Sequence, residues 1–167
     1  MKTVEAYTVS IGGLAVLDTY LTATVIPVPV WVTFLAWASF FVVGATNQAL
    51  LRSVASNLCG LLISSLVLIG ISHGTVSPVV VALAVGAGSA LMVQASKVPA
   101  LAVLPAIVCG FASNVGTVSA SAVSPAAAAL NNPIFLAAVA LVIGNLFGYG
   151  SERLAKALTG PQSPVTP

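Results

Sequence analysis

One acidic residue stands out as a candidate for chemistry, because Asp18 lies in the middle of an apolar stretch. Thr22 follows one helical turn later and falls on the same face of a helix. An ionisable side chain inside a membrane is costly unless it is hydrated or paired, so such residues usually mark functional sites. We expect Asp18 to be protonated, hydrogen-bonded to polar neighbours or exposed to a wet cavity. A buried structural acid at a helix break or an oligomer contact is the alternative.

Amide and hydroxyl side chains form a second candidate set. Asn114 lies beside a serine and one turn after Gly110, inside another apolar stretch. Amides within membrane helices can replace the water around a neutral polar solute, or they can hydrogen-bond neighbouring helices together at about 0.6 kcal/mol each. We expect the second role for Asn57 and Asn145, which lie near predicted helix ends. The predicted solute path consists of Asp18, Thr22, Cys109, Ser113 and Asn114.

The groups that catalyse most reactions are scarce. The chain has one histidine, two cysteines and three acidic residues, and the spacings of a catalytic triad, a metal site or a phosphate-binding loop do not occur. Cys59 and Cys109 each lie in an apolar run, which favours reduced, packed thiols. His73 lies in a predicted outer loop. We therefore expect no enzymatic activity, no cofactor and no metal.

The elements that carry these residues are predicted from composition. Of the 167 residues, 59% are hydrophobic and 5% are charged, whereas soluble domains have about 25% charged residues. A net charge of +2 does not indicate a nucleic-acid partner. Six apolar stretches are each close to the roughly 20 residues that cross a bilayer. We predict an all-α membrane protein, with one domain of six transmembrane helices over residues 1–158 and a disordered polar tail over 159–167. The predicted spans are residues 8–26, 29–45, 53–72, 78–94, 99–118 and 133–150.

Six spans place every basic side chain on one side of the membrane. Cationic residues remain on the cytoplasmic side, so both termini are predicted to be cytoplasmic. An odd number of spans would scatter these cations over both sides. The basic residues are Lys2, Arg52, Lys97, Arg153 and Lys156.

Two further patterns concern the arrangement of the helices. The similar triplets at residues 45–47 and 112–114 suggest two three-helix halves of inverted topology, an arrangement common among transporters. Small residues recur at every fourth position in Ala82-x-x-x-Gly86-x-x-x-Ala90 and in Gly144-x-x-x-Gly148. Such faces let helices pack closely, and they favour a compact bundle and a homo-oligomer.

Several motifs together resemble a known family. They are Trp31-x-x-Phe34-x-x-Trp37-Ala38-x-Phe40-Phe41, Ser56-Asn57-x-x-Gly60 and Gly144-x-x-Phe147-Gly148-Tyr149. This pattern resembles a group of small bacterial inner-membrane proteins catalogued as domain of unknown function 1097, over about residues 14–149. The chain departs from the family at residues 45–48, where a glycine-rich turn is expected. The resemblance implies a multi-pass protein of the bacterial inner membrane, and it supplies no activity and no site residues.

Scarce buried charge combined with scattered amides and hydroxyls suits neutral solutes. We expect a channel or facilitator for a small polar solute such as urea, a small amide or ammonia, with the lipid bilayer as its surroundings. The first alternative is a proton-coupled carrier that uses Asp18. The second is a membrane scaffold without transport activity, which predicts a dry interior and an Asp18 that is sealed from any cavity.

Overall fold

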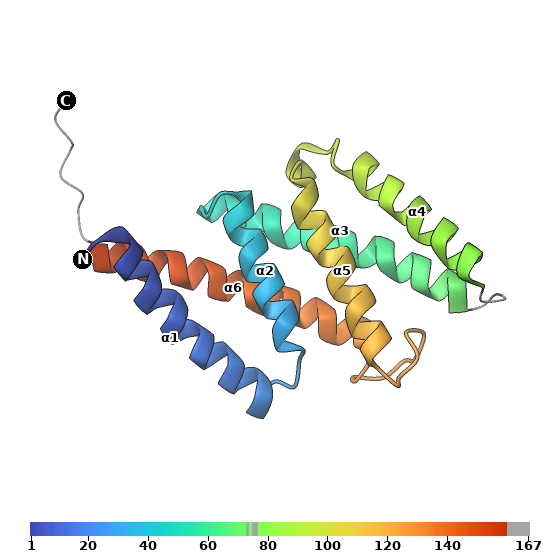
Figure 1. The fold of residues 1–167 in the computed structure, drawn as a ribbon, viewed down its shortest axis with the longest axis horizontal. Helices are drawn as coiled ribbons and strands as arrows, with labels where there is room; N and C mark the ends of the chain where they lie inside the picture. Colours follow the sequence, from blue (N-terminus) through green and yellow to red (C-terminus); the bar gives the residue numbers. More distant parts are fainter. Residues whose placement is uncertain (73, 75–76, 160–167) are drawn as a thin grey trace.

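The computed structural model describes residues 1–72, 74 and 77–159 of the chain. This part contains six α-helices, one short 3-10 helix and no strand, which confirms the predicted all-α fold (Figure 1). The predicted loop residue His73 lies outside the described residues, and so do residues 160–167, which make up most of the predicted tail. The helices are α1 (Thr3–Thr24), α2 (Val30–Val43), α3 (Asn47–Ser72), α4 (Pro78–Ala95), α5 (Leu104–Ala120) and α6 (Pro133–Thr159), and the 3-10 helix η1 is Pro99–Leu101.

Most helix ends follow from local sequence. The hydroxyl of Ser77 accepts a hydrogen bond from the Val80 amide at 3.3 Å, and the side-chain oxygen of Asn132 accepts one from the Ile134 amide at 2.8 Å, so these residues cap α4 and α6. Helix α2 ends at Gly44, whose φ of 119° is a left-handed conformation that favours glycine.

Four predicted boundaries are wrong. Helix α1 begins at Thr3 and α3 at Asn47, five and six residues before their predicted starts, and α5 begins at Leu104 because residues 99–101 form η1. Helix α6 continues to Thr159, past the predicted end of the span at residue 150. The predicted match of residues 45–47 with 112–114 is also wrong, since Asn47 begins a helix and Asn114 lies inside one.

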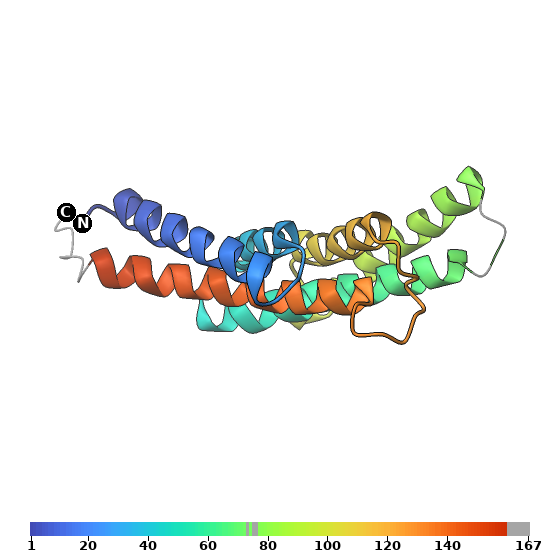
Figure 2. The ribbon, with the colours of Figure 1, turned by 90° about the horizontal axis from the view of Figure 1, so that it is seen from below.

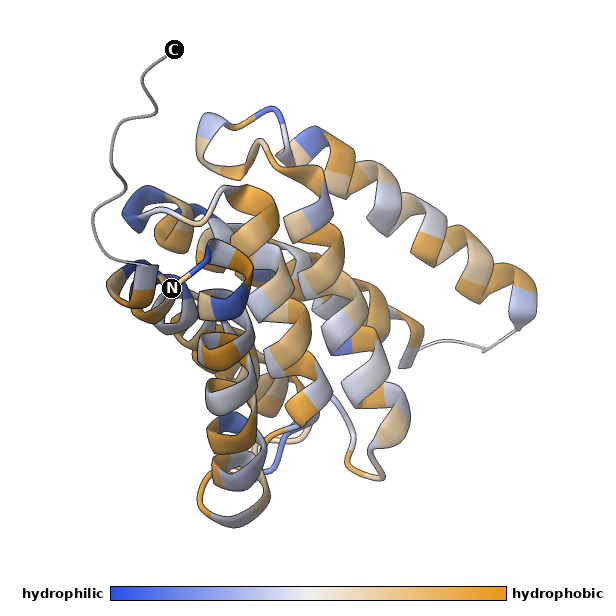
Figure 3. Cartoon of the chain, turned by 60° about the vertical axis from the view of Figure 1, so that its left-hand side comes forward, coloured by the Kyte–Doolittle hydropathy of each residue, from blue (hydrophilic) through white to orange (hydrophobic). Residues whose placement is uncertain are grey.

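Three of the helices, α3, α4 and α6, are long and apolar enough to cross a membrane. Helices α2 and α5 are apolar but have 14 and 17 residues, which gives them lengths of about 21 and 26 Å against a hydrocarbon core of about 30 Å. Hydrophobic residues cover the helices along most of their length, and the strongly hydrophilic segments lie mostly near helix ends (Figure 3).

The helices pack as two groups of three, in which the last helix, α6, joins the first two. Helix α6 packs mainly on α2 and α1, and these three form what we call the first bundle. Helix α3 packs mainly on α5 and also on α4, and these three form the second bundle. Helices α1, α2, α5 and α4 lie in one layer over α6 and α3 (Figure 2). The terminal α-amino group of Met1 donates to the Leu158 carbonyl at 3.4 Å, which joins the two ends of the fold.

Each bundle has its own hydrophobic core. The core of the first bundle includes Val32, Ala140 and Leu141, joined by Leu61 from α3. The core of the second bundle consists of Met92, Ile107 and Phe111 with partly buried neighbours. Because Leu61 belongs to α3, the core of the first bundle reaches the boundary between the two bundles, which we call the inter-bundle interface.

Glycines bring the main helices of each bundle into backbone contact. A Cβ added to Gly60 of α3 would lie 1.9 Å from the carbonyl oxygen of Ile107, and one added to Gly144 of α6 would lie 2.0 Å from that of Thr33. No side chain fits at either position, so both helix pairs are rigidly interlocked.

Candidate solute path

The inter-bundle interface is joined by a chain of buried polar side chains. Ser39 of α2 and Ser53 of α3 form a hydroxyl–hydroxyl hydrogen bond of 2.8 Å. The amide of Asn57 donates to Ser39 at 2.9 Å, and the amide of Asn145 on α6 donates to the Asn57 oxygen at 2.7 Å. All four residues are at most 1% exposed. The two bundles therefore meet through neutral hydrogen bonds.

Both asparagines lie deeper in the protein than predicted. Asn57 is ten residues into α3 because the helix begins at Asn47, and Asn145 lies twelve residues into α6. Their expected role in holding helices together agrees with the hydrogen bond between them. The amide of Asn57 also donates to the Ala106 carbonyl at 2.7 Å, so its two N–H groups are both used.

A hollow lies at each end of the inter-bundle interface. The first, which we call the polar hollow, has a volume of about 460 Å³ and lies between the start of α3 and the end of α6. It is lined by Ala45, Thr46, Asn47, Gln48, Tyr149, Glu152, Arg153 and Lys156. The second, the proline hollow, has about 430 Å³ and lies between the start of α6, the end of α5 and the α1–α2 connection. It is lined by Thr22, Pro27, Val28, Pro29, Trp31, Thr117, Ala120, Ser121, Pro133 and Leu136.

Two rows of polar residues lead inward from the proline hollow. On α5, Thr117 lines the hollow and Ser113 lies one turn deeper, fully buried. Thr117 lies seven positions after Gly110, which contacts the Asn57 backbone, so the hollow lies about 10 Å from the amide chain. On α1, Thr22 lines the same hollow and its hydroxyl donates to the Asp18 carbonyl at 2.8 Å.

Asp18 itself is sealed. It is 0% exposed, and one carboxyl oxygen lies 2.5 Å from the Thr33 hydroxyl of α2. Its other oxygen has no hydrogen-bond partner. Asp18 is therefore hydrogen-bonded, as one of the predicted alternatives requires, and it does not line either hollow.

The remaining predicted path residues lie elsewhere. The amide of Asn114 donates to Ser64 at 2.8 Å and Ser65 at 3.0 Å, which places this side chain against α3 inside the second bundle. Cys109 is a half-buried free cysteine. The structure thus places Asp18, Thr22 and Ser113 near one hollow and separates Asn114 from them. Prediction from the sequence missed Ser39, Ser53 and Thr117, whose only signal was their place in apolar helices.

Buried polar atoms without partners are concentrated among these residues. They are one carboxyl oxygen of Asp18, the side-chain oxygens of Asn114 and Asn145, and the hydroxyls of Ser56 and Ser113. Three of the five atoms are pure acceptors unless Asp18 is protonated. A buried polar atom without a partner costs about 1–3 kcal/mol, so these positions favour molecules that donate hydrogen bonds.

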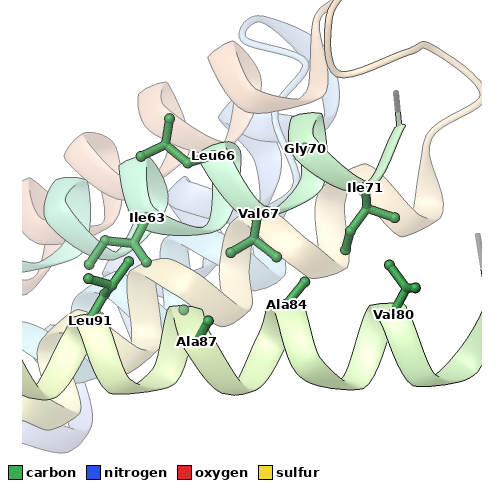
Figure 4. Close-up of a pocket in the computed structure, with 10 residues that line it drawn as sticks. Ile63, Leu66, Val67, Gly70, Ile71, Val80, Ala84, Ala87 and Leu91 are labelled. Carbon is green, nitrogen blue, oxygen red and sulfur yellow. The ribbon is translucent and has the colours of Figure 1, made fainter. Parts of the chain in front are cut away.

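A third hollow differs in chemistry. It has a volume of about 360 Å³ and lies between α3 and α4, where Ile63, Val67, Ala84 and Leu91 face one another (Figure 4). Its lining side chains are all apolar, which suits hydrocarbon and not a polar solute.

The end of α6 carries most of the charge near the polar hollow. Glu152 is 6% exposed, accepts a hydrogen bond from the Tyr7 hydroxyl and forms a 2.9 Å ion pair with Lys156. Tyr7 precedes the first predicted span, and its hydrogen bond to this carboxylate raises its pKa to about 12. Arg153 packs on the ring of Tyr149, with 5.3 Å between the guanidinium carbon and the ring centroid.

The apolar composition and the three helices that are long and apolar enough to cross a membrane together define a helical protein of the membrane type. Residues 8–156 match the family described as protein of unknown function (DUF1097). The chain therefore belongs to the DUF1097 family, and the resemblance seen in its aromatic motifs is confirmed. No curated protein and no solved structure matches the chain.

Proposed function

We propose that this protein is a facilitator that moves a small, mostly neutral polar solute across the bacterial inner membrane along the inter-bundle interface. The observation that supports this proposal is the buried chain Ser53–Ser39–Asn57–Asn145 with a hollow at either end. Neutral amides and hydroxyls can replace the hydration of a neutral solute, whereas they offer little to a fully charged one.

The unpartnered atoms suggest the class of solute. The side-chain oxygen of Asn145, which belongs to the amide chain and has no partner, favours a solute that donates N–H or O–H groups. Urea, small primary amides and ammonia have this character. Ser113 lies between the amide chain and the proline hollow, so its free hydroxyl is placed to contact a passing solute.

The proposal includes six membrane spans in two inverted halves, with both termini cytoplasmic. The pattern of buried, partly buried and exposed residues is identical at all eleven positions of two stretches that lie 74 positions apart, residues 31–41 of α2 and 105–115 of α5. The seven buried residues of α3 from Ala49 to Ser64 correspond to the seven buried residues of α6 from Pro133 to Gly148, 84 positions later. Each half has three helices, so the chain ends the first half on the opposite side of the membrane from where it began. The second half therefore starts from that side and has the inverted topology.

The glycine contacts support the same alignment. Gly60 meets the backbone of Ile107, and its counterpart Gly144 meets the backbone of Thr33, which is the counterpart of Ile107. In the proposed orientation the polar hollow faces the cytoplasm and the proline hollow faces outward, since the termini mark the basic end of the chain.

Flux into proteoliposomes tests the proposal. Swelling in urea, acetamide and ammonia gradients is expected to be faster with the protein than in empty liposomes. Ser113→Val fills the path next to the proline hollow and is expected to return the rate toward that of empty liposomes. Ser89→Val is the matched control, because Ser89 is exposed on α4 away from the interface. Equal rates with and without protein for every solute would refute the facilitator.

A scaffold subunit without transport activity is the second candidate. The sealed environment of Asp18 favours it, because this role predicts a carboxyl group hydrogen-bonded in a dry interior. The scaffold predicts a stoichiometric partner on purification and no flux. The predicted homo-oligomer belongs to either candidate, and sedimentation equilibrium in detergent tests it.

Proton coupling through Asp18 is a variant of the transport proposal. The Thr33 hydroxyl lies 2.7 Å from the Val30 carbonyl as well as 2.5 Å from Asp18, and it has one hydrogen to donate. If that hydrogen goes to the carbonyl, the donor to Thr33 is a protonated Asp18. Helix α2 carries no titratable side chain, and those of α6 lie in its last three turns, at Tyr149, Glu152, Arg153 and Lys156. Coupling predicts that Asp18→Asn abolishes flux driven by a pH gradient and leaves downhill solute flux intact.

A further inference from the structure

We infer that the α1–α2 and α4–α5 connections exchange their open and packed states, so that the protein moves solute by alternating access and not through a fixed pore. This inference rests on the proposed function. It follows from a difference between two positions that the repeat makes equivalent.

The α1–α2 connection and its counterpart, the α4–α5 connection, are packed differently. Pro27 in the first connection lines the proline hollow. Its counterpart 74 positions later, Leu101, is partly buried against Met92 and Ile107 in the core of the second bundle. Helix η1, which ends at Leu101, packs on α3. The equivalent connection is therefore open in the first half and packed in the second.

An inverted repeat makes the reverse arrangement accessible. If the second half adopts the packing of the first and the first adopts that of the second, the α4–α5 connection opens and the proline hollow closes. The fold and its helix contacts are preserved in this exchange. The open site then faces the side of the membrane on which α5 begins.

The contacts within and between bundles have the strengths that such a movement requires. Within each bundle, glycines lock helix backbones together at Gly60 and Gly144, and the core of each bundle is apolar. Between bundles, Leu61 of α3 adds an apolar contact with the first bundle, and the hydrogen bonds of Ser39, Asn57 and Asn145 are neutral and can be exchanged for bonds to solute. The bundles therefore can move as rigid bodies while the amide chain opens and recloses.

The test uses a single cysteine at position 101 as a reporter. Cys59→Ala and Cys109→Ala remove the native thiols, and Leu101→Cys is then labelled with a membrane-impermeant maleimide applied from the side of the termini. Thr117→Trp places a wedge in the proline hollow and prevents its closure. Labelling of position 101 is expected to fall about tenfold with the wedge, as a closure penalty of about 1.4 kcal/mol produces.

Controls separate this inference from the proposed function. Ser89→Trp, a bulky change on the exposed face of α4, is expected to leave labelling unchanged. Pro27→Trp is a second wedge in the same hollow if Thr117→Trp does not yield a monodisperse protein. Solute flux in the cysteine-free protein combined with labelling that neither wedge changes would overturn alternating access and leave a fixed path. Absence of flux in the native protein would instead overturn the proposed function.

Discussion

Replacement of Asn57 by leucine tests whether the amide chain holds the bundles together. Leucine is a physically reasonable substitute, since Leu141 occupies the equivalent position of the other half, 84 positions later. The change removes three hydrogen bonds, two donated by Asn57 and one accepted from Asn145. It leaves one N–H of Asn145 without a partner, while the other still donates to the Leu141 carbonyl at 2.8 Å.

Two magnitudes set the expected size of the effect. A buried polar group left without a partner costs about 1–3 kcal/mol. Hydrogen bonds between membrane helices average about 0.6 kcal/mol and reach about 1.7 kcal/mol in double-mutant cycles. We expect Asn57→Leu to lower the free energy of unfolding by about 1–3 kcal/mol. We expect Asn145→Leu, which also strands the Asn57 oxygen, to have a similar effect.

A double-mutant cycle in detergent measures the bond itself. Asn57→Leu, Asn145→Leu and the double variant are unfolded with increasing dodecyl sulfate and followed by tryptophan fluorescence. In the double variant both amides are gone, so neither is left without its partner. Its loss in free energy of unfolding is therefore expected to be smaller than the sum of the two single losses by about 0.6–1.7 kcal/mol. Strictly additive losses would show that the two amides do not meet, and the interface described above would then be wrong.

Three further outcomes are expected. Gly144→Ala places a Cβ 2.0 Å from the Thr33 carbonyl oxygen and is expected to destabilise the fold by about 1–3 kcal/mol, whereas Gly86→Ala, with open space around it, is expected to have little effect on the melting temperature. Tyr7→Phe removes the hydrogen bond to Glu152 and is expected to lower the melting temperature at neutral pH. Because the pKa of Tyr7 is raised from 10.0 to about 12, that difference is present below pH 10 and narrows as the pH rises toward 12. Trp37→Phe removes the 3.0 Å bond to Ser151 and is expected to destabilise the first bundle by about 0.5–1.5 kcal/mol, measured by the same unfolding.

The sequence predicted the helices well because apolar length is a local property. The six predicted apolar stretches correspond to six helices. The helix starts at Asn47 and Leu104 were missed for different reasons. The polar first turn of α3 has the hydropathy of a loop, and the proline-led 3-10 helix before α5 has the hydropathy of a span.

The site was predicted only in part, because it depends on which helices meet. Thr22 lines the proline hollow, and Ser113 and Asp18 each lie one turn away from a residue that lines it. Asn114 points instead into the second bundle, since the pairing of α3 with α5 brings Ser64 and Ser65 to its amide. No local pattern contains that pairing, which joins residues about fifty positions apart.

The two halves differ in where each keeps its polar residues. The pair Asp18–Thr33 corresponds to Met92–Ile107, 74 positions later, where the second bundle has an apolar core. Conversely, Asn114, which is held by Ser64 and Ser65, corresponds to Phe40, which packs on Gly148 and on the ring of Tyr149. An apolar alternative therefore exists within this chain for each costly polar site. A polar side chain in a membrane core carries a desolvation cost that an apolar one avoids, so these two polar sites are the positions at which we expect substitutions to separate the proposed function from packing.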